Sequence, residues 1–205
     1  MNKLTLIFAI VSICGIVQNV SACEGKTVIY EDNFANDTGG WVLLPSMVDV
    51  EKSSLVINAA AKTNQKTLNF VNPIPAGDIC TDVVFGDNHP ETAAGLLVWG
   101  QDFSNFFVLQ IRHQGSVGIW RMQDNKWLPL IQDRADSSVK KGNAELNRLR
   151  IRATETSLSF FVNNAKIREV RGRPPQVAWY FGVYGAGEKE PATVLFKNFR
   201  VTTLE

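Results

Sequence analysis

The chain has 205 residues, with 21 Lys and Arg against 20 Asp and Glu, and 45% of its residues are hydrophobic. This length suits one large all-β domain or one ordinary α/β domain. The composition excludes a disordered chain and a multi-pass membrane protein. A net charge of +1 lacks the basic excess that nucleic-acid binding requires, so we expect no nucleic-acid partner.

Residues 1–22 have the three-part pattern of a secretory signal peptide. A short basic start ends at Lys3, an almost wholly apolar run extends from Leu4 to Val17, and the small residues Ser21 and Ala22 follow. The apolar run of about 14 residues is too short to cross a bilayer core of roughly 30 Å. We therefore expect a mature domain of residues 23–205 that is secreted or located in the periplasm or cell envelope.

Two cysteines, Cys23 and Cys80, remain once Cys14 leaves with the signal peptide. In an oxidising compartment such a pair predicts one disulfide bond. Val20-Ser21-Ala22-Cys23 also resembles a bacterial lipobox, in which Cys23 would carry lipid and the protein would associate with a membrane. The sequence is compatible with either fate of Cys23. Zinc is not expected, because two isolated cysteines and two distant histidines lack ligand spacing.

Segments of alternating apolar and polar residues recur from Lys26 onward, every eight to twelve residues, with turn residues between them. This spacing is typical of an all-β sandwich or barrel. The stretch Ser137–Leu146 is expected to be a loop, because Gly142 in its middle disfavours a helix. The expected strands are Thr27–Glu31, Gly40–Leu44, Met47–Glu51, Ser54–Asn58, Thr67–Val71, Asp78–Phe85, Ala93–Gly100, Asn105–His113, Ser116–Met122, Lys126–Ile131, Arg148–Thr154, Ser157–Asn163, Lys166–Val170, Val177–Tyr184 and Ala192–Thr202.

The turn residues and the number of strands narrow the fold. Asn163-Asn164 can adopt the positive φ angles that a tight hairpin turn requires. About fifteen strands are too many for an immunoglobulin sandwich of seven to nine strands. They suit a jelly roll, an all-β sandwich of two larger antiparallel sheets packed face to face.

Several motifs, in the order in which they occur along the chain, also resemble those of a known superfamily. These motifs are Glu31-Asp32-Asn33-Phe34 followed by Trp41, Ser54-Leu55-Val56-Ile57, Ala94-Gly95-Leu96-Leu97-Val98-Trp99, Asn105-Phe106-Phe107, Gly118-Ile119-Trp120-Arg121, Asn147-Arg148-Leu149-Arg150-Ile151, Leu158-Ser159-Phe160-Phe161-Val162-Asn163 and Phe196-Lys197-Asn198-Phe199-Arg200-Val201. In this order they resemble the concanavalin A-like lectin/glucanase superfamily, in its laminin-G-like and 3-keto-disaccharide-hydrolase-like branch. The resemblance covers nearly all of residues 23–205 and implies a jelly-roll sandwich.

Function does not follow from this fold, which the superfamily uses for lectins, adhesion modules, hydrolases and lyases. Hydrolases of the superfamily carry a Glu-x-Asp-x-x-Glu strand, and this sequence has none. The nearest carboxylate pairs, Asp49/Glu51, Asp87/Glu91 and Glu188/Glu190, are explained as surface charges. We therefore expect no catalytic residues, although an enzyme with a less regular set of acids stays an alternative.

The resemblance also raises the question of a metal ion. Laminin-G-like relatives often bind a structural Ca²⁺ near the first and last strands, where Asp32 and Asn198 are weak candidate ligands here. Lys197 stands where the closing motif of the family is commonly acidic, and a fixed positive charge disfavours calcium. We therefore expect no cofactor, and a structural calcium ion at Asp32 and Asn198 stays the alternative.

Aromatic residues on a β surface are the remaining candidate for function. Carbohydrate sites place aromatic faces against the apolar side of a sugar ring and add a few polar groups for the hydroxyls. Gln110 and Arg112 share a face opposite the apolar Phe107, Leu109 and Ile111. Tyr180 and Tyr184 share a face with Gly182, whose missing side chain leaves space between them. The candidate ligand-binding residues are Trp99, Gln110, Arg112, His113, Arg121, Trp127, Tyr180 and Tyr184, whereas Trp41, Trp120 and Trp179 are expected in the core.

Together these features favour an exported, non-catalytic carbohydrate-binding or adhesion module with a glycan or polysaccharide as its partner. One alternative is a glycoside hydrolase or lyase resembling the 3-keto-disaccharide hydrolases. Another is a structural lipoprotein of the cell envelope, anchored at Cys23.

Mass spectrometry of the exported protein tests the expected processing. We expect the mature chain to begin at Cys23, because signal peptidases cleave after small residues such as Ala22. A diacylglyceryl group on Cys23 and a Cys23–Cys80 bridge exclude each other, so the same spectrum distinguishes a lipoprotein from a disulfide-bonded one. An exported chain that retains residues 1–22 would contradict the expectation.

Overall fold

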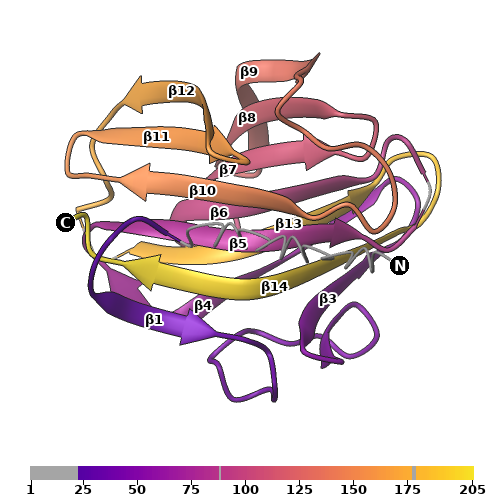
Figure 1. Ribbon diagram of the computed structural model, residues 1–205, viewed down its shortest axis with the longest axis horizontal. Helices are drawn as coiled ribbons and strands as arrows, with labels where there is room; N and C mark the ends of the chain where they lie inside the picture. The colour runs from indigo at the N-terminus through magenta and orange to yellow at the C-terminus, as the bar shows by residue number, and fades with distance from the viewer. Residues whose placement is uncertain (1–22, 88, 177–178) are drawn as a thin grey trace, which may run out of the picture.

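The computed structural model describes residues 23–87, 89–176 and 179–205, and the expected signal peptide lies outside these residues. Fourteen strands form two antiparallel sheets that pack face to face as a sandwich (Figure 1). The all-β, two-sheet fold expected from the sequence is therefore confirmed. Within the described ranges no helix is long and apolar enough to cross a membrane.

The larger sheet has eight strands, and both ends of the described chain belong to it. Strand β1 (Val28–Asp32) pairs with the last strand, β14, outside the main order of the sheet. That order is β12 (Ala165–Arg171), β11 (Ser157–Val162), β10 (Asn147–Ala153), β5 (Gly77–Phe85), β14 (Ala192–Thr202), β3 (Ser54–Ala59) and β2 (Val48–Glu51).

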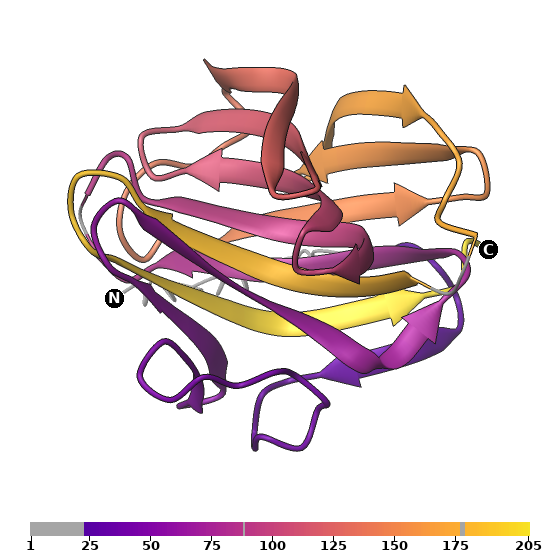
Figure 2. The same cartoon turned by 180° about the vertical axis from the view of Figure 1, so that it is seen from behind.

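The smaller sheet has six strands and lies on the other side of the core (Figure 2). Its edge strands β4 and β9 contain Pro73 and Pro129, which an edge tolerates because one side of the strand needs no ladder hydrogen bonds. Its order is β4 (Thr63–Ile74), β13 (Trp179–Gly187), β6 (Ala93–Asp102), β7 (Asn105–Arg112), β8 (Ser116–Gln123) and β9 (Lys126–Ala135).

The core between the sheets is built from alternate residues of the strands. Leu109 and Ile111 of β7 are fully buried in it, as the alternation of apolar residues predicted. Phe181 of β13 stacks on Phe199 of β14 with ring centroids 5.0 Å apart, which joins one sheet to the other. Trp41 also packs on Phe199, at 4.9 Å, so its expected place in the core is confirmed.

Most of the expected strands are present, and one is wrong. Gly40–Leu44 makes only isolated bridges, because Gly40 has a positive φ of 84° and the Trp41 side chain turns inward to pack in the core. The expected loop at Ser137–Leu146 contains no strand or helix. Asn163 and Asn164 have φ angles of 48° and 70°, which confirms the predicted tight hairpin turn.

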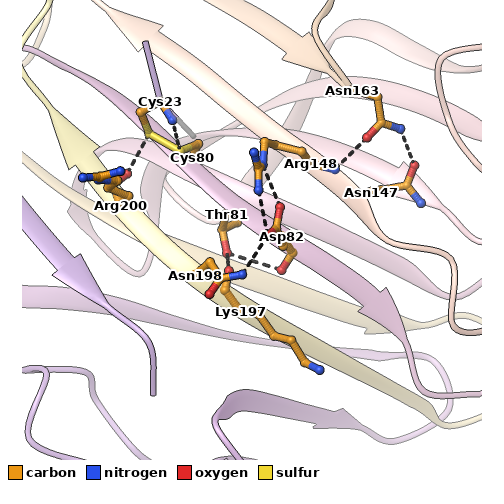
Figure 3. A network of polar contacts seen from close by, with 10 residues as sticks. All are labelled: Cys23, Cys80, Thr81, Asp82, Asn147, Arg148, Asn163, Lys197, Asn198 and Arg200. Carbon is orange, nitrogen blue, oxygen red and sulfur yellow. Dashed lines mark hydrogen bonds and ion pairs between the residues drawn. A yellow bond between two sulfur atoms is a disulfide. The ribbon is translucent and has the colours of Figure 1, made fainter. Parts of the chain in front are cut away.

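The outer face of the eight-stranded sheet carries a ladder of ion pairs. Asp78, Cys80 and Asp82 alternate along β5, opposite the alternating arginines of β10. Arg148 Nε donates to Asp82 Oδ1 at 2.7 Å (Figure 3), and Arg150 Nε donates to Asp78 Oδ1 at 2.7 Å. Such cross-strand pairs of opposite charge stabilise the register of neighbouring strands.

Cys23 and Cys80 form a disulfide bond beside this ladder (Figure 3). The disulfide expected from the sequence is therefore confirmed, and it attaches the start of the described chain to the middle of β5. The lipobox alternative needs a free Cys23 sulfur to form a thioether, and here that sulfur is bonded to Cys80.

Replacing both cysteines by serine (C23S/C80S) is expected to lower the free energy of unfolding by about 4 kcal/mol, because the bridge closes a 57-residue separation that the unfolded chain would otherwise leave open. Urea denaturation of parent and variant measures the difference. Reduction of the parent with dithiothreitol serves as the matched control and should give the same loss. Equal stability of all three forms would show that the bridge contributes nothing.

Candidate functional site

The face of the six-stranded sheet that points away from the core, here called the groove face, carries a second apolar cluster. Phe106, Met122 and Tyr184 are buried in this cluster, although they lie outside the main core. Trp120 and Trp127 are half-buried against it. Apolar side chains on the outer face of a sheet are unusual unless a partner covers them or a ligand binds there.

A hollow of about 280 Å³ opens on the groove face. Trp127 forms one of its walls and packs edge-on against Tyr184, with ring centroids 5.7 Å apart. On its other side Trp127 packs against Phe106 at 5.8 Å. The complete lining is Gln110, Arg112, Trp120, Trp127, Tyr184 and Glu188, so the hollow combines three aromatic rings with two charged groups and an amide.

Arg112 is the centre of the polar part of the hollow. Its Nε donates to Asp133 Oδ2, and its Nη2 donates to Glu188 Oε1 at 3.0 Å. A third bond, of 2.8 Å, runs from Nη1 to the carbonyl oxygen of Glu91. These bonds use all three guanidinium nitrogens and orient the side chain in one direction.

Asp133 is the second centre of this network. Trp120 Nε1 donates to its Oδ1 at 2.9 Å, and Gln110 Nε2 donates to its Oδ2 at 3.0 Å. Asp133 can lie this close to β8 because residue 118 is glycine: a Cβ at that position would lie 2.0 Å from Asp133 Oδ1. The network therefore joins β7, β8 and β9 through side chains that lie far apart in the sequence.

Two ionisable groups in the hollow have displaced pKa values. Burial alone would lower the pKa of Arg112, but the bonds to Asp133 and Glu188 outweigh it and raise that pKa above its ordinary value. Burial raises the pKa of the Tyr184 phenol well above its ordinary value. Arg112 is thus cationic and Tyr184 neutral across the physiological range.

The hollow continues into a wider depression at one end. Arg112 and Glu188 also line this depression, which measures about 420 Å³ and includes Lys62, Gln114 and Lys189. The two together form one groove, which runs from an aromatic end to a charged end. A groove of this kind accommodates a ligand longer than a single ring.

Four of the residues singled out in the sequence meet in this groove: Gln110, Arg112, Trp127 and Tyr184. Tyr180 lies on the same face but packs on Phe70, with ring centroids 4.9 Å apart. The space expected over Gly182 is filled, because Leu68 lies against that glycine and a Cβ there would be 2.7 Å from Leu68 Cδ2.

The other three residues singled out for ligand binding lie elsewhere. Trp99 is 3% exposed and belongs to the core, because it has a positive φ of 51° within an irregular stretch of β6 that turns its side chain inward. His113 packs on Phe85, and its Nε2 lies 2.8 Å from Asn143 Oδ1. Arg121 lies over the Phe107 ring at 5.3 Å, outside the groove.

Several residues of the groove were not among the sequence candidates for ligand binding, and three of them belong by their side chains to the network around Arg112. Trp120 was expected in the core, and this is wrong, because it shares the outward face with Gly118 while Val117 and Ile119 point inward. That alternation was visible in the sequence. Asp133 was missed because β9 extends to Ala135 instead of ending at Ile131. Glu188 was considered only with its sequence neighbour Glu190, whereas its partner in space is Arg112.

Of the other acidic residues considered in the sequence, Glu91 lines the depression together with Glu188, whereas Asp87 does not. Asp87 Oδ2 accepts from the Thr193 amide at 2.6 Å, which fixes a loop, and Glu91 pairs with Lys189 at 3.1 Å. Among the two calcium candidates, Asp32 Oδ2 accepts from Trp41 Nε1 at 2.9 Å, and Asn198 donates to Asp82 (Figure 3). In the part of the chain that is described, no group of three or more His, Cys, Asp or Glu residues could hold a metal ion.

Comparison with solved structures identifies the architecture. A carbohydrate-binding module, CBM66 from Bacillus subtilis, superposes with a TM-score of 0.64 at 12% identity, covering 80% of this chain and 96% of that one. The catalytic domain of an endo-1,3-β-glucanase (laminarinase) from Thermotoga petrophila RKU-1 gives 0.62 at 10% identity, covering 88% and 98%. The fold is that of the concanavalin A-like sandwiches.

A transglycosylase, Crh5 in its apo form, also shares this concanavalin A-like fold, with a TM-score of 0.63 at 11% identity over 90% of each chain. No protein-family model matches the sequence. No curated protein matches it either. The similar structures thus include both a binding module and enzymes, and at these identities they show the fold alone.

Replacing Arg112 by glutamine is expected to lower the free energy of unfolding by about 2 kcal/mol, because it leaves Asp133 and Glu188 without their shared cation in a partly buried site. Urea denaturation measures the loss. Arg134→Gln, on the same strand as Asp133 but exposed, is the matched control and should change stability little. Equal effects of the two substitutions would contradict the central role of Arg112.

Proposed function

We propose that this protein is a non-catalytic carbohydrate-binding module that holds a glycan chain in the groove of the six-stranded sheet. The observation that carries the proposal is the presence of the Trp127 and Tyr184 rings and the fixed Arg112–Asp133 ion pair in one groove. Sugar rings present an apolar face and a rim of hydroxyl groups, and this hollow offers a complement to each.

The aromatic end supplies the stacking surface. Trp127 and Trp120 are half-buried, so part of each indole stays open to a ligand. Burial keeps the Tyr184 phenol neutral, and within the described residues its hydroxyl has no hydrogen-bond partner. A sugar hydroxyl that bonds this oxygen would satisfy it.

The polar end supplies hydrogen bonds of fixed direction. Arg112 is held by Asp133, Glu188 and the Glu91 carbonyl group, so little side-chain freedom is lost when a ligand binds. Carboxylate oxygens accept from sugar hydroxyls and the guanidinium donates to them. Because positive and negative groups alternate here, we propose that the glycan in this groove is uncharged.

Hydrolysis is less compatible with the same groove. Glycosidases place one carboxyl group on each side of the scissile bond, about 5 to 9.5 Å apart. Of the carboxylates that line the groove, Glu91 pairs with Lys189. The Arg112 guanidinium lies between the other two, Asp133 and Glu188, and bonds to both. It therefore occupies the place that a scissile bond would need.

We place the protein outside the cytoplasm, secreted or in the cell envelope. The Cys23–Cys80 bond supports this placement, because disulfides persist in oxidising compartments and are reduced in the cytosol. A glycan-binding module also meets polysaccharides there.

Replacing Trp127 by alanine is expected to weaken binding to a neutral polysaccharide by about tenfold or more, because buried aromatic anchors dominate binding energy. A glycan array of neutral polysaccharides identifies the ligand, and isothermal titration calorimetry then measures parent and variant. Phe103→Ala removes an exposed aromatic outside the hollow and is the matched control, expected to bind as the parent does.

Two results would overturn this proposal. One is equal binding by the parent and the Trp127→Ala variant, with circular dichroism showing both folded. The other is turnover of a glycoside or keto-glycoside by the parent that disappears in Asp133→Asn, which would make the protein an enzyme.

A further inference from the structure

A second cavity, here called the arginine pocket, lies apart from the hollow that Arg112 lines. It measures about 140 Å³ and includes residues from the ends of β6, β7 and β8 and from the segment after β12. Its lining is Trp99, Gln101, Asn105, Phe106, Phe107, Arg121, Met122, Arg173, Pro174 and Pro175. Whole ligands usually need cavities of roughly 300 Å³ or more, so this volume suits one group of a larger molecule.

The charges around the arginine pocket are all of one sign. Arg121 and Arg173 line it, and none of its lining residues is acidic. Within the described residues neither arginine forms an ion pair, in contrast to Arg112, Arg148 and Arg150. Arg121 is held in position by the Phe107 ring, 5.3 Å from the guanidinium carbon. Two unpaired guanidinium groups at one cavity form a site for an oxyanion.

Trp99, in the wall of the same pocket, provides an independent observation. It is 3% exposed, and its indole Nε1 has no hydrogen-bond acceptor among the described residues. Its φ of 51° is also a strained value for so bulky a side chain. An unpaired buried donor costs stability, and backbone strain of this kind concentrates at ligand sites.

The rest of the lining favours a sugar as the carrier of the anion. Pro174, Pro175 and Phe107 provide apolar surface, while the amides of Gln101 and Asn105 can bond hydroxyl groups. An inorganic anion without a sugar would contact only Arg121 and Arg173.

We propose that the arginine pocket binds the anionic group, a carboxylate or a sulfate ester, of an acidic sugar residue. Arg121 and Arg173 would pair with the anion, and its oxygens would bring acceptors to the wall that contains the Trp99 indole. This second site is independent of the proposed function, because its arginines and Trp99 do not line the Arg112 hollow. Substitution of Trp127 removes one contact of Phe106 in the pocket wall but neither arginine nor the Trp99 indole.

Titration of the ¹⁵N-labelled protein with glucose 6-sulfate, glucose and inorganic sulfate tests the proposal by nuclear magnetic resonance. The Trp99 indole N–H signal, assigned with Trp99→Phe, is expected to shift in a saturable way with glucose 6-sulfate and to stay unchanged with glucose. Binding of glucose 6-sulfate is expected to weaken about tenfold or more in Arg121→Gln/Arg173→Gln, which removes two charged partners. Arg168→Gln, an exposed arginine on β12, is the matched control and should bind as the parent does.

Several outcomes would overturn the proposal. An absence of any saturable shift, or an unchanged affinity in the double variant, would show that the pocket binds no anion. Inorganic sulfate binding as tightly as glucose 6-sulfate would show that the sugar contributes nothing. Loss of glucose 6-sulfate binding in Trp127→Ala with retention in the double variant would place the anion in the groove instead.

Discussion

Phe181 and Phe199 stack on each other from opposite sheets, and the apolar core to which they belong determines which face of each regular strand is buried. A strand with one face in this core must place its alternate residues on the outside. On β7 this constraint buries Leu109 and Ile111 and turns Gln110 and Arg112 to the groove face. The candidate site is thus a consequence of the same packing that stabilises the sandwich.

The groove then depends on electrostatics between strands that are distant in the sequence. Arg112 on β7 meets Asp133 on β9, and Glu188 follows β13. A cation that is held by two anions is rigid, and rigid polar groups lose little entropy on binding a ligand. The opposite arrangement occurs at the arginine pocket, where Arg121 and Arg173 have no acid beside them. The two sites therefore differ in the charge of the ligand that they suit.

The alternation of residues predicts the orientation and pairing of side chains and strands wrongly where the strand is irregular. Strict alternation from Leu97 would turn Trp99 to the groove face, but its left-handed backbone conformation rotates it into the core. Similarly, Gly40–Leu44 has a strand-like sequence, yet Trp41 packs on Phe199 and leaves the segment with isolated bridges only. In both cases a large aromatic side chain gains more from burial in the core than from regular pairing.

From the sequence alone, the alternation of residues and turn pairs such as Asn163-Asn164 were sufficient to predict the sandwich and most of its strands, while the two cysteines predicted the Cys23–Cys80 bond as one of two fates of Cys23. These predictions rest on local patterns, or on the only two cysteines of residues 23–205. The site was only half predictable. Gln110 and Arg112 were recognised from their face of the strand, whereas Asp133 and Glu188 acquire their role only when folding brings them to Arg112. Ion pairs between distant strands depend on register and sheet order, which no local pattern contains.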